Sequence, residues 1–464
     1  MLMLTLHKQW LESRREGRLL WLFLMLILLL VVALGSGWAQ YQQAGDIRQQ
    51  VSAAERERWL DQGNKGPHAA AHYGIYVIKP QTPLAVLDPG LSAYQGNVLR
   101  LEAHKQNNTL FRQIEDRVAM QRFGQLSPAF IMQTLLPLFI ILSGFHLIAA
   151  ERESGTLKQL LASGVNPAGL FYAKMLSLSG FVLLFLCPVI GYLLWRDDSD
   201  LSRSLFFIGG YAVYMVIWSM ITMITSAYSA TARQALVILL MLWSTGCLLL
   251  PKLVMDDAVS RYPLQSSRVF DAKLETTVYT PQRQQALTQF KQQTLDKYQV
   301  STTEHLPFAW AGAQLQFGED YANRLTLPLY QARNQQLDSQ NQHYSHGGLL
   351  SPFIALQVLS MSAAGSDFSD DLWFVDMAEQ HRQQVQRILN SDLKFNGKDH
   401  DDDHGYQADH LLWQKIPHFN PHYPALSQVS SIHLEAMLSL VGWFVLLLSL
   451  CVLAIKRLTK ERRT

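Results

Sequence analysis

Six long runs of apolar residues constrain this chain more than any other feature of its sequence. Each run reaches about 20 residues or more, the length that an α-helix needs to cross the hydrocarbon core of a bilayer. A chain inside a bilayer must satisfy its backbone hydrogen bonds internally, so these runs are expected to be helices. The predicted spans are 19–39, 128–150, 169–195, 204–226, 235–254 and 433–455.

The first run has an alternative interpretation as a signal peptide, because Gly37 and Ala39 could imitate a cleavage site. Its apolar core is longer than the 7–15 residues typical of that class, so an uncleaved span is favoured. Residues 1–18 mix four basic side chains with leucines and a tryptophan, which predicts an amphipathic helix in the membrane interface.

Basic residues flank both ends of the chain, in 1–18 and in the tail 456–464. The positive-inside rule places both termini in the cytoplasm, and six crossings return the chain to its starting side. The same count puts segments 151–168 and 227–234 inside the cell. The polar segments 40–127 and 255–432, with the short loop 196–203, then lie on the other side of the membrane, which is the periplasm if the protein belongs to a bacterial inner membrane, as the family resemblance described below implies.

The two long polar segments predict a mostly helical extracytoplasmic domain, and the fold class is therefore an all-α membrane protein. Residues 72–80 are typical of a strand or extended chain, whereas the leucines of 97–122 favour helices. In the second segment, helices are expected over 281–298, 321–340 and 371–393, and a short helix directed at the membrane begins near Ser351. All three cysteines fall inside apolar runs, so no disulfide is expected to staple this domain.

A short charged and amphipathic segment, 151–168, separates the second and third runs. Ser154 and Thr156 can cap a helix start, and three leucines then follow at i, i+3 and i+4, which gives one apolar face. Gly164 and Pro167 end this helix. Because so short a helix is marginal alone in water, its apolar face is expected to dock on the bilayer surface or on another protein.

The pattern Glu-Arg-Glu-Ser-Gly-Thr-Leu from Glu151, followed by Leu-Leu-Ala-Ser, resembles the first cytoplasmic loop of ABC-2 type exporter permeases. In that family the loop is a coupling helix that sits in a groove of the ATPase subunit. Parts of 40–127 also resemble a large insert found in one branch of the family. A generic charged loop between two membrane helices is the alternative. The expected ATPase-contact residues are Glu151, Glu153, Gly155, Thr156, Leu157, Leu160 and Leu161.

The resemblance implies a non-catalytic permease subunit of an ATP-driven exporter. The chain lacks the Gly-x-x-x-x-Gly-Lys-Ser/Thr pattern of a phosphate-binding loop, so ATP and Mg²⁺ are expected in a separate cytoplasmic ABC ATPase. The other expected partners are a second permease copy, identical or related, and the lipid bilayer, and a periplasmic adaptor could join them. A net charge of +2 argues against nucleic-acid binding.

Polar and aromatic residues within the spans could line a transport pathway, although many such residues only pack helices or anchor them at the interface. The candidates are His146, Gln133, Tyr214 and Trp218. A separate tract, 398–410, collects His400, His404 and His410 among aspartates. The i, i+4 spacing of the first two can bind Zn²⁺ or Cu²⁺ on a helix, but Gly405 and the aspartates favour a solvated loop.

Two other functions remain open at this point. One is a membrane-anchored periplasmic protein that binds metal or hydrolyses a substrate. The other is a non-transporting scaffold that uses the ATPase to drive a periplasmic partner mechanically. The sequence names no transported substrate.

Overall fold

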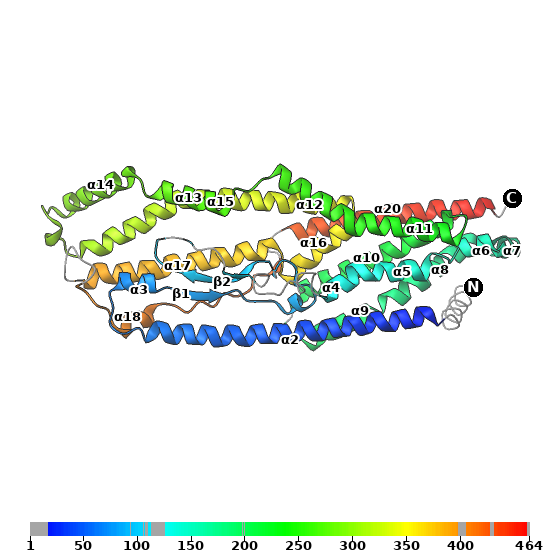
Figure 1. The fold of residues 1–464 in the computed structure, drawn as a ribbon, viewed down its shortest axis with the longest axis horizontal. Helices are drawn as coiled ribbons and strands as arrows, with labels where there is room; N and C mark the ends of the chain where they lie inside the picture. Colours follow the sequence, from blue (N-terminus) through cyan, green and yellow to red (C-terminus); the bar gives the residue numbers. More distant parts are fainter. Residues whose placement is uncertain are drawn as a thin grey trace.

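The computed structural model describes residues 17–92, 94–104, 106, 110–112, 126–196, 198, 200–397, 405–426 and 431–461. The interfacial helix expected over 1–18 falls almost entirely outside this set. The described chain is mostly helical and forms an elongated molecule (Figure 1).

Six helices in the described part of the chain are long and apolar enough to cross a membrane, which agrees with the predicted number of spans. Three are uninterrupted: α2 (Arg18–Leu60), α10 (Leu201–Tyr228) and α20 (Ile432–Glu461). The third span consists of α8 (Pro167–Leu183) and α9 (Leu186–Trp195). The first helix continues well beyond the predicted span and is about 65 Å long at 1.5 Å per residue.

The second and fifth spans each contain a π-helical turn next to a proline. Helices α4 (Pro128–Phe130) and α5 (Leu136–Gly144) flank the turn η3 (Ile131–Leu135), while α11 (Ala232–Ser244) and α12 (Leu250–Arg261) flank η4 (Thr245–Leu249). Proline cannot donate the usual backbone hydrogen bond, so carbonyls one turn earlier need other partners. Tyr214 donates to the carbonyl of Gln133 at 2.7 Å, and Ser351 donates to that of Gly246 at 2.8 Å. Neighbouring elements therefore stabilise both interruptions.

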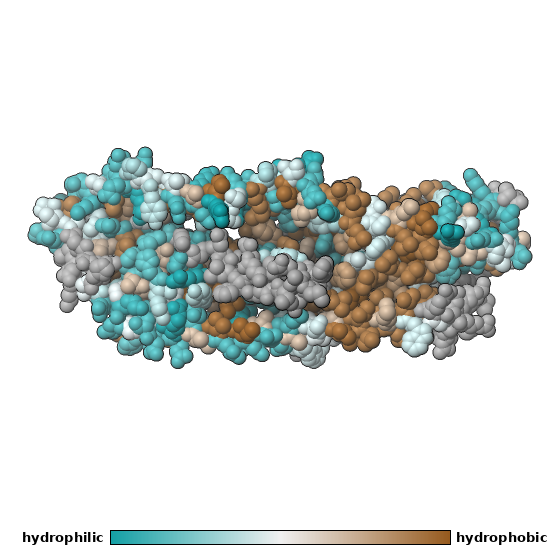
Figure 2. Space-filling model, in the orientation of Figure 1, coloured by the Kyte–Doolittle hydropathy of each residue, from teal (hydrophilic) through white to brown (hydrophobic). Residues whose placement is uncertain are grey.

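The long axis of the molecule joins two ends of different character. At one end, here called the elbow end, lie the short helices α6 (Ala149–Glu153) and α7 (Thr156–Ala162), the start of α2 and the C-terminal end of α20 (Figure 1). Helix α14 (Pro281–Tyr298) marks the opposite, polar end. Figure 2 shows a broad apolar surface over the membrane-length helices and a mainly hydrophilic surface toward the polar end.

The polar end corrects the all-α expectation, because it contains a small antiparallel sheet in the order β1–β2–β3. The strands are β1 (Ile75–Ile78), β2 (Gly96–Leu101) and β3 (Leu110–Arg112). The strand expected within 72–80 is confirmed, whereas the helices expected from the leucines of 97–122 are wrong for 97–101 and 110–112. Leu99 and Leu101 are two residues apart, so they share one face of a strand, where they pack against Phe374.

Helices make up most of the second polar segment. Helix α14 confirms the prediction over 281–298, and α15 (Trp310–His346) and α17 (Phe368–Asn396) contain the other two predicted helices but extend beyond both ends. The shorter elements are α3 (Pro67–Tyr73) and η1 (Pro83–Val86) in the first segment, and α13 (Ser267–Val278), η5 (Thr303–His305), η6 (Gly347–Leu349) and α18 (His410–Lys415) in the second.

The short helix expected after Ser351 is α16 (Pro352–Ala364), and it is almost wholly buried. Its leucines belong to the same core as the membrane-length helices, and Leu359 lies so close to Gly210 of α10 that a side chain there would collide with it. A 13-residue helix is too short to cross a bilayer. Helix α16 therefore extends the second polar segment into the bundle of membrane-length helices.

Candidate functional site

The elbow, defined as residues 149–162, connects the second and third membrane-length helices. Gly155 separates α6 from α7 in a left-handed conformation with φ of 78°, which L residues with side chains adopt only at a cost. The expected capping by Ser154 and Thr156 is wrong. Both hydroxyls instead donate to the carbonyl of Glu151, at 3.3 and 3.2 Å, so they stabilise the end of α6 and not the start of α7.

Three consecutive charged residues join α6 to four membrane-length helices. Glu151 forms an ion pair with Lys174, in the middle of α8, at 2.7 Å. Arg152 pairs with Glu461 of α20 at 3.1 Å and donates to the carbonyl of Ala227 in α10 at 2.7 Å. Glu153 accepts a hydrogen bond of 3.0 Å from the backbone of Ala232, at the start of α11. Any displacement of α6 must therefore act on all four helices.

The charges match the helix ends that they contact. Arg152 also donates to the carbonyl of Ser229, which directly follows α10, at 2.7 Å. Carbonyl groups at a helix C-terminus carry partial negative charge and favour a cation, whereas amide groups at an N-terminus favour an anion such as Glu153. The two contacts therefore stabilise the turn between α10 and α11.

The leucines of α7 do not form an external docking surface, contrary to the sequence-based expectation. Leu157 and Leu161 are each 1% exposed and pack in the main core of the bundle, and Leu160 is partly buried. The bundle of the chain itself covers the apolar face. The exposed residues of the elbow that remain available to a partner are Glu153, Ser154, Thr156, Lys158, Gln159 and Ala162.

Three of the predicted pathway residues lie together in the interior of the bundle. Gln133 donates to the hydroxyl of Tyr211 at 2.7 Å, the hydroxyl of Tyr214 donates to the carbonyl of Gln133, and the ring of Trp218 lies 6.4 Å from that of Tyr214. All are buried. His146 lies in the turn between α5 and α6, about 20 Å farther along the helix axis, so it does not join this group.

The same network contains Asp88 and Ser360, which the sequence analysis did not select. Asp88 follows η1 and is buried, and it accepts hydrogen bonds from Ser360 of α16 and from Gly90. Burial raises the pKa of Asp88, and these hydrogen bonds oppose the rise. The Asp-Pro-Gly sequence predicts only a turn. Asp88 could be identified only from its contacts with Ser360 and Gln133, which are distant in the sequence. In this conformation the network is a packed polar layer between the helices.

The predicted metal ligands are not brought together within the described residues. His400 and His404 fall outside the described ranges, and His410 is exposed at the first position of α18. Where side chains are described, the group with a spacing suited to a metal consists of His68, His72 and His104. The i, i+4 spacing of the first two was a visible signal, but nothing local in the sequence links them to His104.

Comparison with known proteins adds one match. Residues 268–422 match the family described as a domain of unknown function, DUF3526. The match covers less than half of the chain and runs from α13 through α18, so it includes the buried helix α16 and excludes the elbow. No curated protein and no solved structure matches the chain.

Proposed function

We propose that this chain is the membrane-spanning subunit of an ATP-driven exporter of the ABC-2 type. In this proposal the elbow end faces the cytoplasm, and the elbow contacts a separate ATPase that binds and hydrolyses ATP. The polar end then projects into the periplasm. The observation that carries the proposal is the set of contacts between α6 and the helices α8, α10, α11 and α20.

Those contacts give the elbow a mechanical role. A partner that pushes on the exposed face of α7 would press Leu157 and Leu161 against the core and would move α6 through Glu151, Arg152 and Glu153. Because packed cores respond to such shifts by switching between discrete arrangements, a small displacement can reorient whole helices. Two copies of the permease, each contacting one ATPase, would complete the transporter.

The exposed carboxylate of Glu153 provides the sharpest test of this contact. Glu153→Lys reverses one charge on the outer surface of the elbow and removes the hydrogen bond to Ala232. We expect the variant to enter the membrane normally and to lose co-purification with the partner ATPase. Glu275→Lys is the matched control, because it makes the same charge change on an exposed residue of α13 near the polar end, and it should leave co-purification unchanged.

Gly155→Trp tests the same surface by size. Apart from the two chain neighbours, no residue has an atom within 4 Å of a Cβ built at Gly155, so the indole has room to project from the elbow. The left-handed backbone adds a local cost of about 1–2 kcal/mol, which should not prevent insertion. If both elbow variants retain the ATPase as well as the Glu275→Lys control does, the elbow is not the contact and the proposal fails.

A further inference from the structure

Three histidines from two separate elements meet near the polar end. His68 and His72 lie one turn apart on α3, whose opposite face is held by the buried residues Pro67, Ala70 and Ala71. His104 follows β2, three residues after the end of the strand. The ring centroids are 4.7, 5.3 and 5.0 Å apart, so the three imidazoles form a compact triangle.

The nitrogen separations suit one shared metal ion. Nε2 of His68 and Nε2 of His72 are 3.3 Å apart, and the ligand atoms of all three residues lie within 4.8 Å of one another. A tetrahedral zinc with bonds of about 2.0–2.1 Å places its nitrogen ligands about 3.3 Å apart. The first pair already has this separation, and small rotations of His104 would bring the third nitrogen to it.

The buried carboxylate of Glu319 holds the ring of His104 in an orientation suited to binding a metal. Glu319 of α15 accepts from Nδ1 of His104 and from its backbone amide, both at 2.8 Å. Metal-bound histidines usually donate their other ring N–H to such a carboxylate, which fixes the tautomer. Because Nδ1 is engaged, Nε2 is the nitrogen of His104 left for a metal. The backbone of His104 is held in the left-handed region, with φ of 71°.

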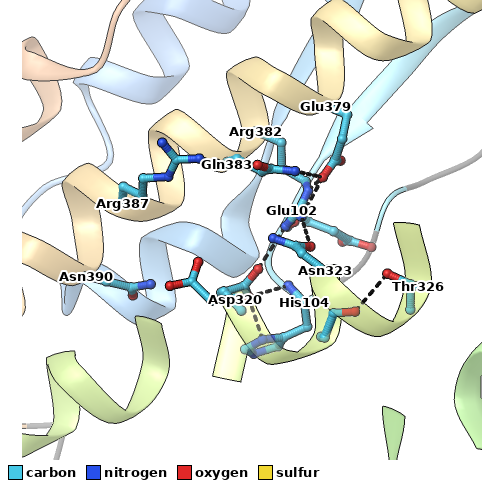
Figure 3. A network of polar contacts seen from close by, with 12 residues as sticks. Glu102, His104, Asp320, Asn323, Thr326, Glu379, Arg382, Gln383, Arg387 and Asn390 are labelled. Carbon is cyan, nitrogen blue, oxygen red and sulfur yellow. Dashed lines mark hydrogen bonds and ion pairs between the residues drawn. The ribbon is translucent and has the colours of Figure 1, made fainter. Parts of the chain in front are cut away.

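The carboxylate of Glu319 is itself held by a buried arginine. Arg382 of α17 is 1% exposed and binds Glu319 at 3.0 Å, Glu379 at 2.8 Å and Asn323 at 2.9 Å. Figure 3 shows Arg382 between Glu379, Asn323 and Glu102, with His104 at the lower side of the network. The support behind the histidines is therefore rigid.

We infer that His68, His72 and His104 form a binding site for one divalent transition metal, with Zn²⁺ as the best-fitting ion. Three neutral imidazoles and a water molecule are a common ligand set for zinc. His72 is exposed, so the fourth position can reach solvent. Arg100 lies nearby and donates to the carbonyl of His72 at 3.1 Å, but its ion pair with Glu102 at 3.4 Å offsets its charge.

The bound metal would tie the two polar segments together. The three ligands belong to the first segment, while Glu319 and Arg382, which orient His104, belong to the second. Metal binding would therefore order the end of β2 against α15. This site lies away from the elbow and does not depend on the export proposal.

The test uses the full-length chain in detergent, freed of metal with a chelator and then titrated with Zn²⁺ by calorimetry. We expect one zinc per chain, with a gain in melting temperature. The single change His72→Ala alters an exposed side chain and should keep the fold while weakening zinc binding strongly. Glu319→Gln retains all three ligands and removes the carboxylate charge that His104 and Arg382 share, so it should weaken zinc binding about 10–100-fold. The readout is zinc affinity, measured at a temperature at which thermal unfolding shows that the metal-free variant is folded.

A matched control separates this site from the histidine tract of 398–410. The double variant His400→Ala with His404→Ala should bind zinc as the unmodified chain does. A second readout replaces Zn²⁺ with Co²⁺, whose visible absorption is expected to report tetrahedral nitrogen coordination and to disappear in His72→Ala. Zinc binding that survives His72→Ala and Glu319→Gln unchanged, or that vanishes in the His400 and His404 double variant, would overturn the inference.

Discussion

Adjacent buried residues of α17 differ in how their charge is compensated. Arg382 is surrounded by acceptors from Glu319, Glu379 and Asn323. His381, one position earlier, is 9% exposed, and within the described residues its Nε2 has no hydrogen-bond partner. A buried imidazole without an acceptor resists protonation, since the charged form would lose its hydration. Arg382 therefore keeps its charge in the folded chain, whereas burial disfavours the charged form of His381.

The pH response of His381 leads to a measurable prediction. Burial, together with the nearby His418, lowers the pKa of His381 to about 4, against about 6.5 in an unfolded chain. The unfolded chain then binds more protons between these values, so stability is complete above pH 6.5 and is lost as pH falls toward 4. The loss is at most about 3 kcal/mol. We expect the melting temperature of the chelator-treated chain to fall between pH 7.5 and 5, and to fall less in His381→Gln.

The exposed His422 provides the control for this measurement. His422→Gln changes an imidazole that solvent already hydrates in the folded chain, so the melting temperature of this variant should fall with pH as steeply as that of the unmodified chain. An unchanged slope in His381→Gln would mean that other groups cause the acid sensitivity.

At the level of residues, the sequence contains local signals, such as the leucine spacing of α7, but not contacts between distant residues. The i, i+4 spacing of His68 and His72 is also a local signal, although the sequence analysis did not select this pair. The contact between His104 and Glu319 joins residues 215 positions apart, and no periodicity predicts it. The leucines of α7 were correctly identified as an apolar face, but whether that face meets a partner or the bundle depends on tertiary packing.

Among the elements, the end of the buried helix α16 depends on one side chain. Arg203, near the start of α10, is 2% exposed and donates to the carbonyls of Ser362 and Ala363, in the last turn of α16, at 3.1 and 3.3 Å. It also donates to the carbonyl of Pro424 at 3.1 Å, and a carboxylate oxygen of Asp370 lies 4.0 Å away. One guanidinium therefore connects α10, α16 and the chain before α20.

Arg203→Met is expected to destabilise the chain by about 2–4 kcal/mol, because several buried carbonyls lose charged donors at once. Arg203→Lys should recover only part of this loss, since one ammonium group cannot reproduce the planar fork of the guanidinium. Thermal unfolding in detergent measures both. Arg261→Met is the control, because that arginine is 63% exposed at the end of α12 and should change stability by less than about 0.5 kcal/mol. If Arg203→Met and Arg261→Met lower the free energy of unfolding equally, the buried contacts of Arg203 do not stabilise the chain as proposed.

At the level of elements, local signals predicted helices well and interruptions poorly. Thr280-Pro281 marks the start of α14, because proline is favoured in the first turn, and the predicted boundaries agree with the structure. Pro137 and Pro251 can be read from the sequence, but the π-helical turns beside them depend on Tyr214 and Ser351 from other elements. Of the three strands, only β1 was predicted. Leu99 and Leu101 were assigned to a helix, although residues two apart share one face of a strand, and both pair with residues of β1.

For the molecule as a whole, the elbow and the described parts of the chain nearest both termini lie at one end, and α14 lies at the other (Figure 1). This arrangement agrees with the even number of predicted crossings. The apolar surface between the two ends in Figure 2 is where hydrocarbon would cover the helices. Under the proposed function, the two ends face opposite sides of the membrane.

Cysteine labelling tests this placement directly. In a background where Cys187, Cys247 and Cys451 are replaced by alanine, Lys158→Cys marks the exposed face of α7 and Lys297→Cys marks the exposed end of α14. A membrane-impermeant maleimide applied to intact spheroplasts should modify the cysteine at 297 and should reach the one at 158 only after the membrane is permeabilised. Modification of both from outside would mean that the elbow cannot meet a cytoplasmic ATPase. Modification of the cysteine at 158, but not of the one at 297, from outside would place α14 in the cytoplasm and the elbow outside, and would contradict the proposed contact with an ATPase.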